Sequence, residues 1–140
     1  RFNEIQAAIG IKQLEKLPGW NEARRKIAQA YNEALNNLVV VPIEEQWAKR
    51  VYHMYVIRTE KRNKLREFLK EKGISTGIHY PIPITKQPAM TDMLGQRSSF
   101  KNSELAAKTV LSLPLHPQLS INEIEYVCAK ISQFFEKIKS

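Results

Sequence analysis

The sequence predicts an α+β domain: a small three-stranded sheet, helices packed on one face of it, and a long helix that leads in. Segments with apolar residues every three to four positions alternate with short β-branched or alternating segments, as in interleaved helices and strands. A length of 140 residues and an apolar share of 43% are enough for one hydrophobic core. We therefore expect a single structural unit, with residues 1–36 as the leading helix and residues 37–140 as the α+β part.

The leading helix is predicted from two apolar segments. Residues 3–17 are rich in helix formers, and their apolar side chains cover more than one face. Such a wide apolar arc is typical of a helix buried on several sides, as between two domains or two subunits. Pro18 and Gly19 interrupt the pattern, and a stripe with a period of 3.6 residues begins at Trp20. One kinked helix and a pair of successive helices both satisfy this pattern.

Three short segments predict the strands of the sheet. Residues 38–41 form a β-branched run, residues 51–58 are dense in strand formers on both faces, and residues 74–80 alternate. Pro81 and Pro83 follow the last segment and cannot donate to a ladder, so pairing should end there.

Helices are predicted over residues 61–72, over residues 104–111 and from residue 121 to the end of the chain. Gly73 is a stop signal for the first of these helices. Ser120 and Glu123 have the spacing of a capping box and should open the last one.

The composition narrows the classes of function. Lys and Arg total 22 against 14 acidic residues, a net charge of +8, which favours an anionic partner or indicates a solvated basic surface. The basic residues are scattered and no nucleic-acid-binding motif is present, so we expect no nucleic-acid partner. No apolar stretch approaches the roughly 20 residues that span a bilayer. Cys128, the single cysteine, cannot form an internal disulfide and favours a reducing, cytoplasmic compartment.

The strongest local candidate for a binding site is the His79–Tyr80 pair at the end of the third predicted strand. Two prolines fix the direction of the chain after it, and a stiffened segment loses little entropy when a ligand binds. An aromatic plug at a buried strand end is the alternative interpretation. His53 is predicted to be a partly buried core histidine, and His116 a hydrogen-bonded turn histidine. The sequence holds no catalytic motif and no metal-ligand spacing.

Four segments together resemble one known family. They are, in order, Arg1–Gly10 (RFNEIQAAIG), Val51–Arg58 (VYHMYVIR), Gly73–Pro83 (GISTGIHYPIP) and Leu113–Pro117 (LPLHP). They resemble the DegT/DnrJ/EryC1/StrS family, whose members are mostly pyridoxal-phosphate-dependent sugar aminotransferases. The sequence departs from the family pattern in three places: Phe2 replaces Met or Leu, Thr85 replaces a usual His, and Pro18–Gly19 interrupts a helix.

The resemblance implies that the chain is the C-terminal small domain of a fold-type-I aminotransferase. The large N-terminal domain of such an enzyme supplies the cofactor lysine and the main cofactor contacts. We therefore expect no catalytic residue, no cofactor-binding residue and no metal ligand here, and no activity from this chain alone. Arg1, His79 and Tyr80 match positions that face the nucleotide sugar, commonly across a homodimer interface.

The parent enzyme implied by the resemblance transfers an amino group, from glutamate or a similar donor, to a keto-sugar nucleotide. Its product would enter the biosynthesis of surface polysaccharide, lipopolysaccharide or another glycan. The alternatives are a non-catalytic interaction or regulatory module of the same family and, less favoured, a basic nucleic-acid-binding domain.

Overall fold

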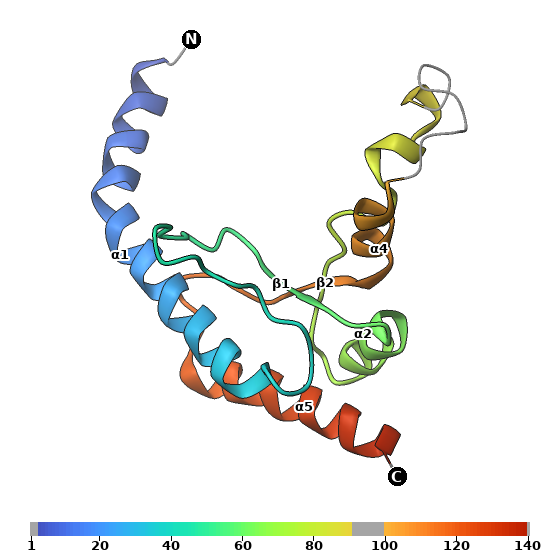
Figure 1. Cartoon of the computed structure of the whole chain (residues 1–140). Helices are drawn as coiled ribbons and strands as arrows, with labels where there is room; N and C mark the ends of the chain where they lie inside the picture. Colours follow the sequence, from blue (N-terminus) through green and yellow to red (C-terminus); the bar gives the residue numbers. More distant parts are fainter. Residues whose placement is uncertain (1–2, 91–99, 140) are drawn as a thin grey trace.

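The computed structural model describes residues 3–90 and 100–139. Its elements are, in order, α1 (Glu4–Leu35), β1 (Tyr55–Arg58), α2 (Arg62–Glu71), the 3₁₀ helix η1 (Ile84–Lys86), α4 (Lys101–Thr109), β2 (Val110–Leu113) and α5 (Ile121–Lys139). α5 packs against both α1 and α2, and Figure 1 shows the N-terminal part of α1 extending away from the rest of the fold. The structure therefore has the predicted α+β class and the predicted long leading helix.

α1 is one continuous helix of 32 residues, with Pro18 inside it. At its start, the Asn3 side chain accepts a hydrogen bond from the Gln6 backbone N–H at 2.8 Å, which satisfies one of the free amides of the first turn. The proline removes one backbone donor, but this part of the helix is exposed, so water can satisfy the carbonyl that loses its partner. Of the two alternatives that the sequence left open, the structure thus has one helix and not two successive helices.

The sheet has two strands within the described residues, and the expectation of three strands was wrong. β1 and β2 are antiparallel, with Tyr55 opposite Leu113 and Arg58 opposite Val110. The segments around Val40 and Gly77 each meet an edge of this ribbon through a single bridge. Each of these segments is followed by a proline, which cannot continue a ladder.

β1 is also shorter than the predicted segment 51–58, for a local reason. Tyr52 has φ of 47°, in the left-handed region, which interrupts the extended backbone. The strand therefore begins only at Tyr55.

β2 was not predicted, because the sequence indicated a helix as far as residue 111. α4 instead ends at Thr109, and Val110 begins the strand that pairs with β1. Pairing with a distant strand overrides the local preference here. The predictions for α2 and for the start of α5 are confirmed: Ser120 N–H donates to the Glu123 carboxylate at 2.8 Å, and Glu123 N–H donates to Ser120 Oγ at 3.3 Å.

One hydrophobic core lies between the sheet and the two long helices. Tyr55, Ile57 and Leu111 of the strands are completely buried, as are Tyr31 of α1 and Ile131 of α5. Burial of a large aliphatic or aromatic side chain contributes about 1.5–3 kcal/mol, so this cluster is the main stabilising element. None of the helices within the described residues is long and apolar enough to cross a membrane.

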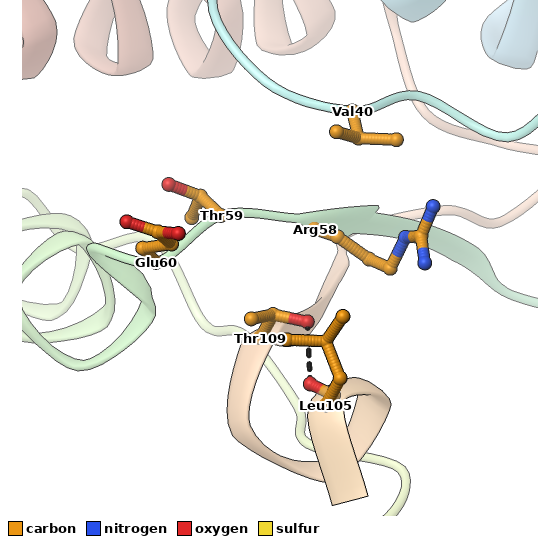
Figure 2. A pocket seen from close by; sticks show the side chains of 6 residues that line it. All are labelled: Val40, Arg58, Thr59, Glu60, Leu105 and Thr109. Atoms are coloured by element: carbon orange, nitrogen blue, oxygen red, sulfur yellow. Dashed lines mark hydrogen bonds between the residues drawn. The ribbon is translucent and has the colours of Figure 1, made fainter. Parts of the chain in front are cut away.

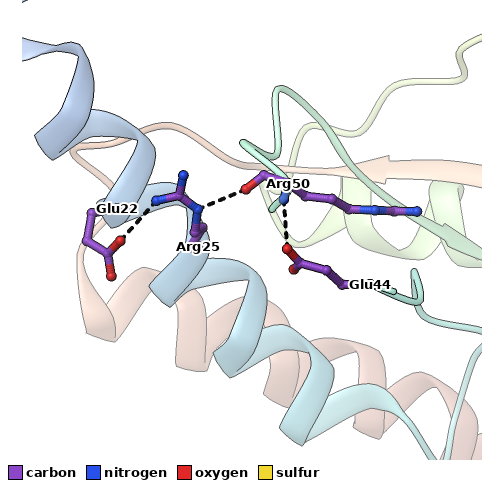
Figure 3. Close-up of polar contacts among 4 residues, drawn as sticks. All are labelled: Glu22, Arg25, Glu44 and Arg50. Carbon is purple, nitrogen blue, oxygen red and sulfur yellow. Dashed lines mark hydrogen bonds and ion pairs between the residues drawn. The ribbon is translucent and has the colours of Figure 1, made fainter. Parts of the chain in front are cut away.

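Polar contacts fix the segment before β1 against α1. The Glu44 carboxylate accepts hydrogen bonds from Arg50 N–H at 2.7 Å and from the Tyr52 hydroxyl at 2.8 Å. Arg25 of α1 donates to the Arg50 carbonyl at 2.9 Å and pairs with Glu22 at 3.0 Å (Figure 3). The hydrogen bonds from Arg50 and Tyr52 lower the pKa of Glu44, because they favour its charged form.

Candidate functional site

His79 and Tyr80 lie at the rim of a pocket of about 290 Å³. Its walls come from the segment after His79, from η1 and from one face of α4. The lining residues are His79, Tyr80, Ile82, Pro83, Ile84, Thr85, Ser103, Ala106, Ala107 and Val110. The proline-rich segment predicted from the sequence is thus one wall of a concave surface, which is where small ligands bind.

The imidazole of His79 is held from two sides. Its Nδ1 lies 2.9 Å from Oγ of Ser112, a buried residue of β2. Gly77 is the second close neighbour of the ring, because a Cβ added there would come within 2.5 Å of Cε1. No side chain larger than hydrogen fits at residue 77 unless the ring moves.

Tyr80 packs with its ring nearly perpendicular to that of His79, with centroids 5.5 Å apart. The peptide bond between the two residues is cis. Tyr80 is 72% exposed and His79 is exposed as well, so neither residue plugs the core. Both residues are accessible to a ligand.

Thr85 also lines this pocket. In the sequence it was identified only as a departure from the family pattern. Its Oγ1 is buried and makes no hydrogen bond with any residue that the structure describes. Lys86 of η1 pairs with Glu104 of α4 at 3.6 Å, which ties this turn to the opposite wall. The substitution of threonine for histidine was visible in the sequence, but the burial of its hydroxyl depends on the packing of η1 on α4.

The other candidate residues lie elsewhere. Arg1 falls outside the residues that the structure describes. His53 is exposed, so its prediction as a partly buried core residue was wrong: the left-handed backbone at Tyr52 leaves His53 before the strand rather than in it. His116 lies in a turn, where its carbonyl accepts a hydrogen bond from Leu119 N–H at 3.1 Å.

A second pocket, of about 210 Å³, lies between β1 and α4 (Figure 2). It is lined by Val40, Arg58, Thr59, Glu60, Leu105 and Thr109. The one hydrogen bond drawn among these residues, from the Thr109 hydroxyl to the Leu105 carbonyl at 2.8 Å, is internal to α4. Their polar groups do not converge on a common point, so this pocket is a weaker candidate than the one beside His79.

The groups around His79 are suited to binding rather than to bond making. They offer an imidazole, a phenol and two hydroxyls, all of which form hydrogen bonds to oxygen atoms. Among the described residues, no lysine and no carboxylate lines the pocket, and no cluster of His, Cys, Asp and Glu could hold a metal ion. Burial raises the pKa of the Cys128 thiol to about 11, which keeps it protonated and unreactive.

The chain is similar in sequence and in structure to known aminotransferases. A family model described as the DegT/DnrJ/EryC1/StrS aminotransferase family matches residues 1–132. A pleiotropic regulatory protein of Geobacillus stearothermophilus is 40% identical over 139 residues, which cover 96% of this chain and 37% of the relative. A dTDP-3-amino-3,6-dideoxy-alpha-D-galactopyranose transaminase of Aneurinibacillus thermoaerophilus is 36% identical, with 96% of this chain and 37% of the relative covered.

Among solved structures, S. venezuelae DesV, crystallised in complex with a ketimine intermediate, superposes with a TM-score of 0.92 at 33% identity. The match covers 97% of this chain and 37% of that one. The chain thus spans little more than a third of the length of the relatives it matches.

Proposed function

This chain belongs to the DegT/DnrJ/EryC1/StrS aminotransferase family, and from that membership we propose that it is the C-terminal part of an enzyme that aminates a keto-sugar nucleotide. A transaminase among its relatives, named for a dTDP-linked amino sugar, supports the substrate class. We extend the proposal to glutamate or a similar amino donor, to a homodimeric cytoplasmic enzyme, and to a pathway that builds surface polysaccharide or another glycan.

The cofactor proposed for the parent is pyridoxal phosphate, which stabilises the negative charge that develops on carbon during amino transfer. The pocket beside His79 lacks the groups needed to hold this cofactor by itself, because no lysine and no carboxylate lines the pocket among the described residues. Residues of the parent outside this chain would hold the cofactor. The contribution of this chain is then to bind and orient the substrate.

The observation that carries this role is the fixed orientation of His79 at the rim of a concave surface. A side chain already held by a hydrogen bond and by close packing loses little entropy when it binds a ligand. His79 and Tyr80 would donate hydrogen bonds to the diphosphate or sugar oxygens, and Arg1 would add a charge-assisted contact. The buried hydroxyl of Thr85 is a further candidate contact, since it lacks a partner among the described residues.

The exposed half of α1 has a part in the same proposal. Ile5, Ile9 and Leu14 are 73%, 57% and 65% exposed, although all three are large and apolar. Large apolar side chains exposed in this number on one helix mark an interaction site. We assign it to contact with the rest of the parent enzyme.

The test is to substitute His79→Ala in the full-length parent and to measure KM for the nucleotide sugar together with the melting temperature. A lost hydrogen bond to a charged group costs about 1.5–3 kcal/mol, so KM should rise roughly tenfold to a hundredfold. His116→Ala is the matched control, because His116 is also exposed but does not line the pocket. A lower melting temperature with unchanged KM would show that His79 is only a packing residue.

A regulatory function is the second candidate, because the relative with 40% identity is named as a regulatory protein. Nucleotide-sugar binding and amino transfer, both measured on the unsubstituted full-length parent, distinguish the two functions. A full-length parent that binds nucleotide sugar but shows no amino transfer with any donor would favour the regulatory module.

A further inference from the structure

We propose that Ser112 is the residue that positions His79, by donating a hydrogen bond to Nδ1 and so fixing the imidazole proton on Nε2. The distance between Ser112 Oγ and His79 Nδ1 is 2.9 Å, well within hydrogen-bonding range. The two residues are 33 positions apart in the sequence. The contact therefore depends on the approach of the Gly77 segment to the edge of β2.

Ser112 is a rigid support for this contact. The residue is only 6% exposed, and it lies within β2. Its backbone N–H donates to the Gly77 carbonyl at 2.8 Å, and its carbonyl accepts from Gly77 N–H at 3.0 Å. These two bonds hold Ser112 Oγ at a set distance from the start of the segment that carries His79.

The direction of the hydrogen bond follows from the surroundings of the hydroxyl. Among the described residues, His79 is the one hydrogen-bond partner of Ser112 Oγ. If Nδ1 carried the proton and donated it, the buried serine proton would have no acceptor, and a buried donor without a partner is costly. If the hydroxyl donates instead, its proton is satisfied and Nδ1 is the acceptor. A neutral imidazole with an unprotonated Nδ1 carries its proton on Nε2.

The packing of the ring then determines where that proton lies. Gly77 leaves the space beside Cε1 that a Cβ would fill, and the Tyr80 ring packs nearly at right angles to the imidazole. Nε2 makes no hydrogen bond with the residues that the structure describes, and His79 lines the pocket. His79 thus offers an Nε2–H donor, which recognises an acceptor oxygen such as that of a phosphate, a hydroxyl or a carbonyl.

The protonation of His79 can be tested on this chain directly, by ¹⁵N NMR of its imidazole at alkaline pH. In the unsubstituted chain we expect the proton on Nε2 and an Nδ1 resonance typical of a nitrogen that accepts a hydrogen bond. In Ser112→Ala the Nδ1 resonance should move to that of a free nitrogen, and the second tautomer should become detectable. Ser112→Thr, which keeps a hydroxyl, should restore the original spectrum. Ser75→Ala is the control, since Ser75 is an exposed serine near the same segment.

Two results would overturn the assignment: a proton on Nδ1 in the unsubstituted chain, or an Nδ1 resonance that Ser112→Ala leaves unchanged. The first result requires no variant, so a substitution that fails to fold does not prevent the test. Gly77→Ala is a second perturbation, because it displaces the ring while it leaves the serine hydroxyl in place.

The consequence for substrate binding rests on the proposed function and is measured separately, in the full-length parent. Ser112→Ala should raise KM for the nucleotide sugar about fivefold, the effect of one neutral hydrogen bond. It should cause no further rise in a His79→Ala background, because Ser112 acts through His79. If the NMR result holds and KM does not change, the substrate-binding role of His79 is contradicted, while the pairing of Ser112 with His79 stands.

Discussion

The two halves of α1 belong to the same helix but lie in different surroundings. In the second half, Ile27, Tyr31 and Leu35 are buried against α5 and the sheet. In the first half, Ile9 and Leu14 are more than half exposed. Both halves are rich in helix formers, so helix propensity does not separate them. The difference shows that apolar side chains on a helix predict a buried surface. They do not show whether the element that covers this surface belongs to the same chain.

The pattern of apolar residues separates the two halves better than their number does. A single stripe with a period of 3.6 residues matches one buried face, as in the second half of α1. The first half has apolar residues over a wide arc, which no element within the described residues covers. This contrast is the basis of three predictions about α1.

The largest effect is expected from the same substitution made in each half. Leu35→Ala removes a fully buried side chain and should lower the free energy of unfolding by about 2–5 kcal/mol. Leu14→Ala, at a position that is 65% exposed, should change it by less than about 0.5 kcal/mol. Urea unfolding followed by circular dichroism gives both values. Equal losses in the two variants would mean that the first half is also packed in the free chain.

The second prediction concerns the response to alkaline pH of the core that contains Tyr31, from the packed half of α1, and Tyr55 of β1. Burial raises the pKa of Tyr31 and Tyr55 well above the usual value for tyrosine. The unfolded chain ionises near pH 10 while these two side chains stay neutral in the folded state, so the unfolded state binds fewer protons. Stability is therefore fully present below about pH 10 and falls above it, by at most about 1.4 kcal/mol per pH unit for each of these tyrosines.

Unfolding of the chain and of Tyr31→Phe, measured at a series of pH values, checks this dependence. The variant loses the hydrogen bond to the Pro114 carbonyl, which should cost about 1 kcal/mol at neutral pH. Its stability should also fall less steeply above pH 10. A parallel decline in the two proteins would contradict the contribution of Tyr31.

Substitutions in the exposed half should have the smallest effect on stability. The same substitutions should strongly reduce association of the chain with itself. The free chain should self-associate despite its net charge of +8, because Ile5 and Leu14 expose apolar surface. Replacing both by Gln should reduce association while changing the free energy of unfolding by less than about 0.5 kcal/mol per site. Sedimentation velocity over a wide concentration range provides the measurement. A chain that stays monomeric before substitution would count against an interface on this half of α1.

The candidate site was predicted from the sequence in part. The His79–Tyr80 pair and the proline-rich segment after it were identified as a candidate site, and both residues line the same pocket. No pattern in the sequence indicated that Ser112 contacts His79, because the two residues lie far apart along the chain. It flagged Thr85 through the family pattern alone, and the burial of its hydroxyl appears only once η1 packs against α4.

What the sequence by itself determined is local. The capping box at Ser120 and Glu123 joins residues three positions apart, and the bounds of α2 and α5 follow from short-range periodicity and stop signals. The tertiary structure decided what depends on distant partners: that Val110 begins a strand instead of continuing a helix, and that Ser112 orients His79. Local energies act between neighbours along the chain, whereas strand pairing and side-chain contacts form only when remote segments pack around one core.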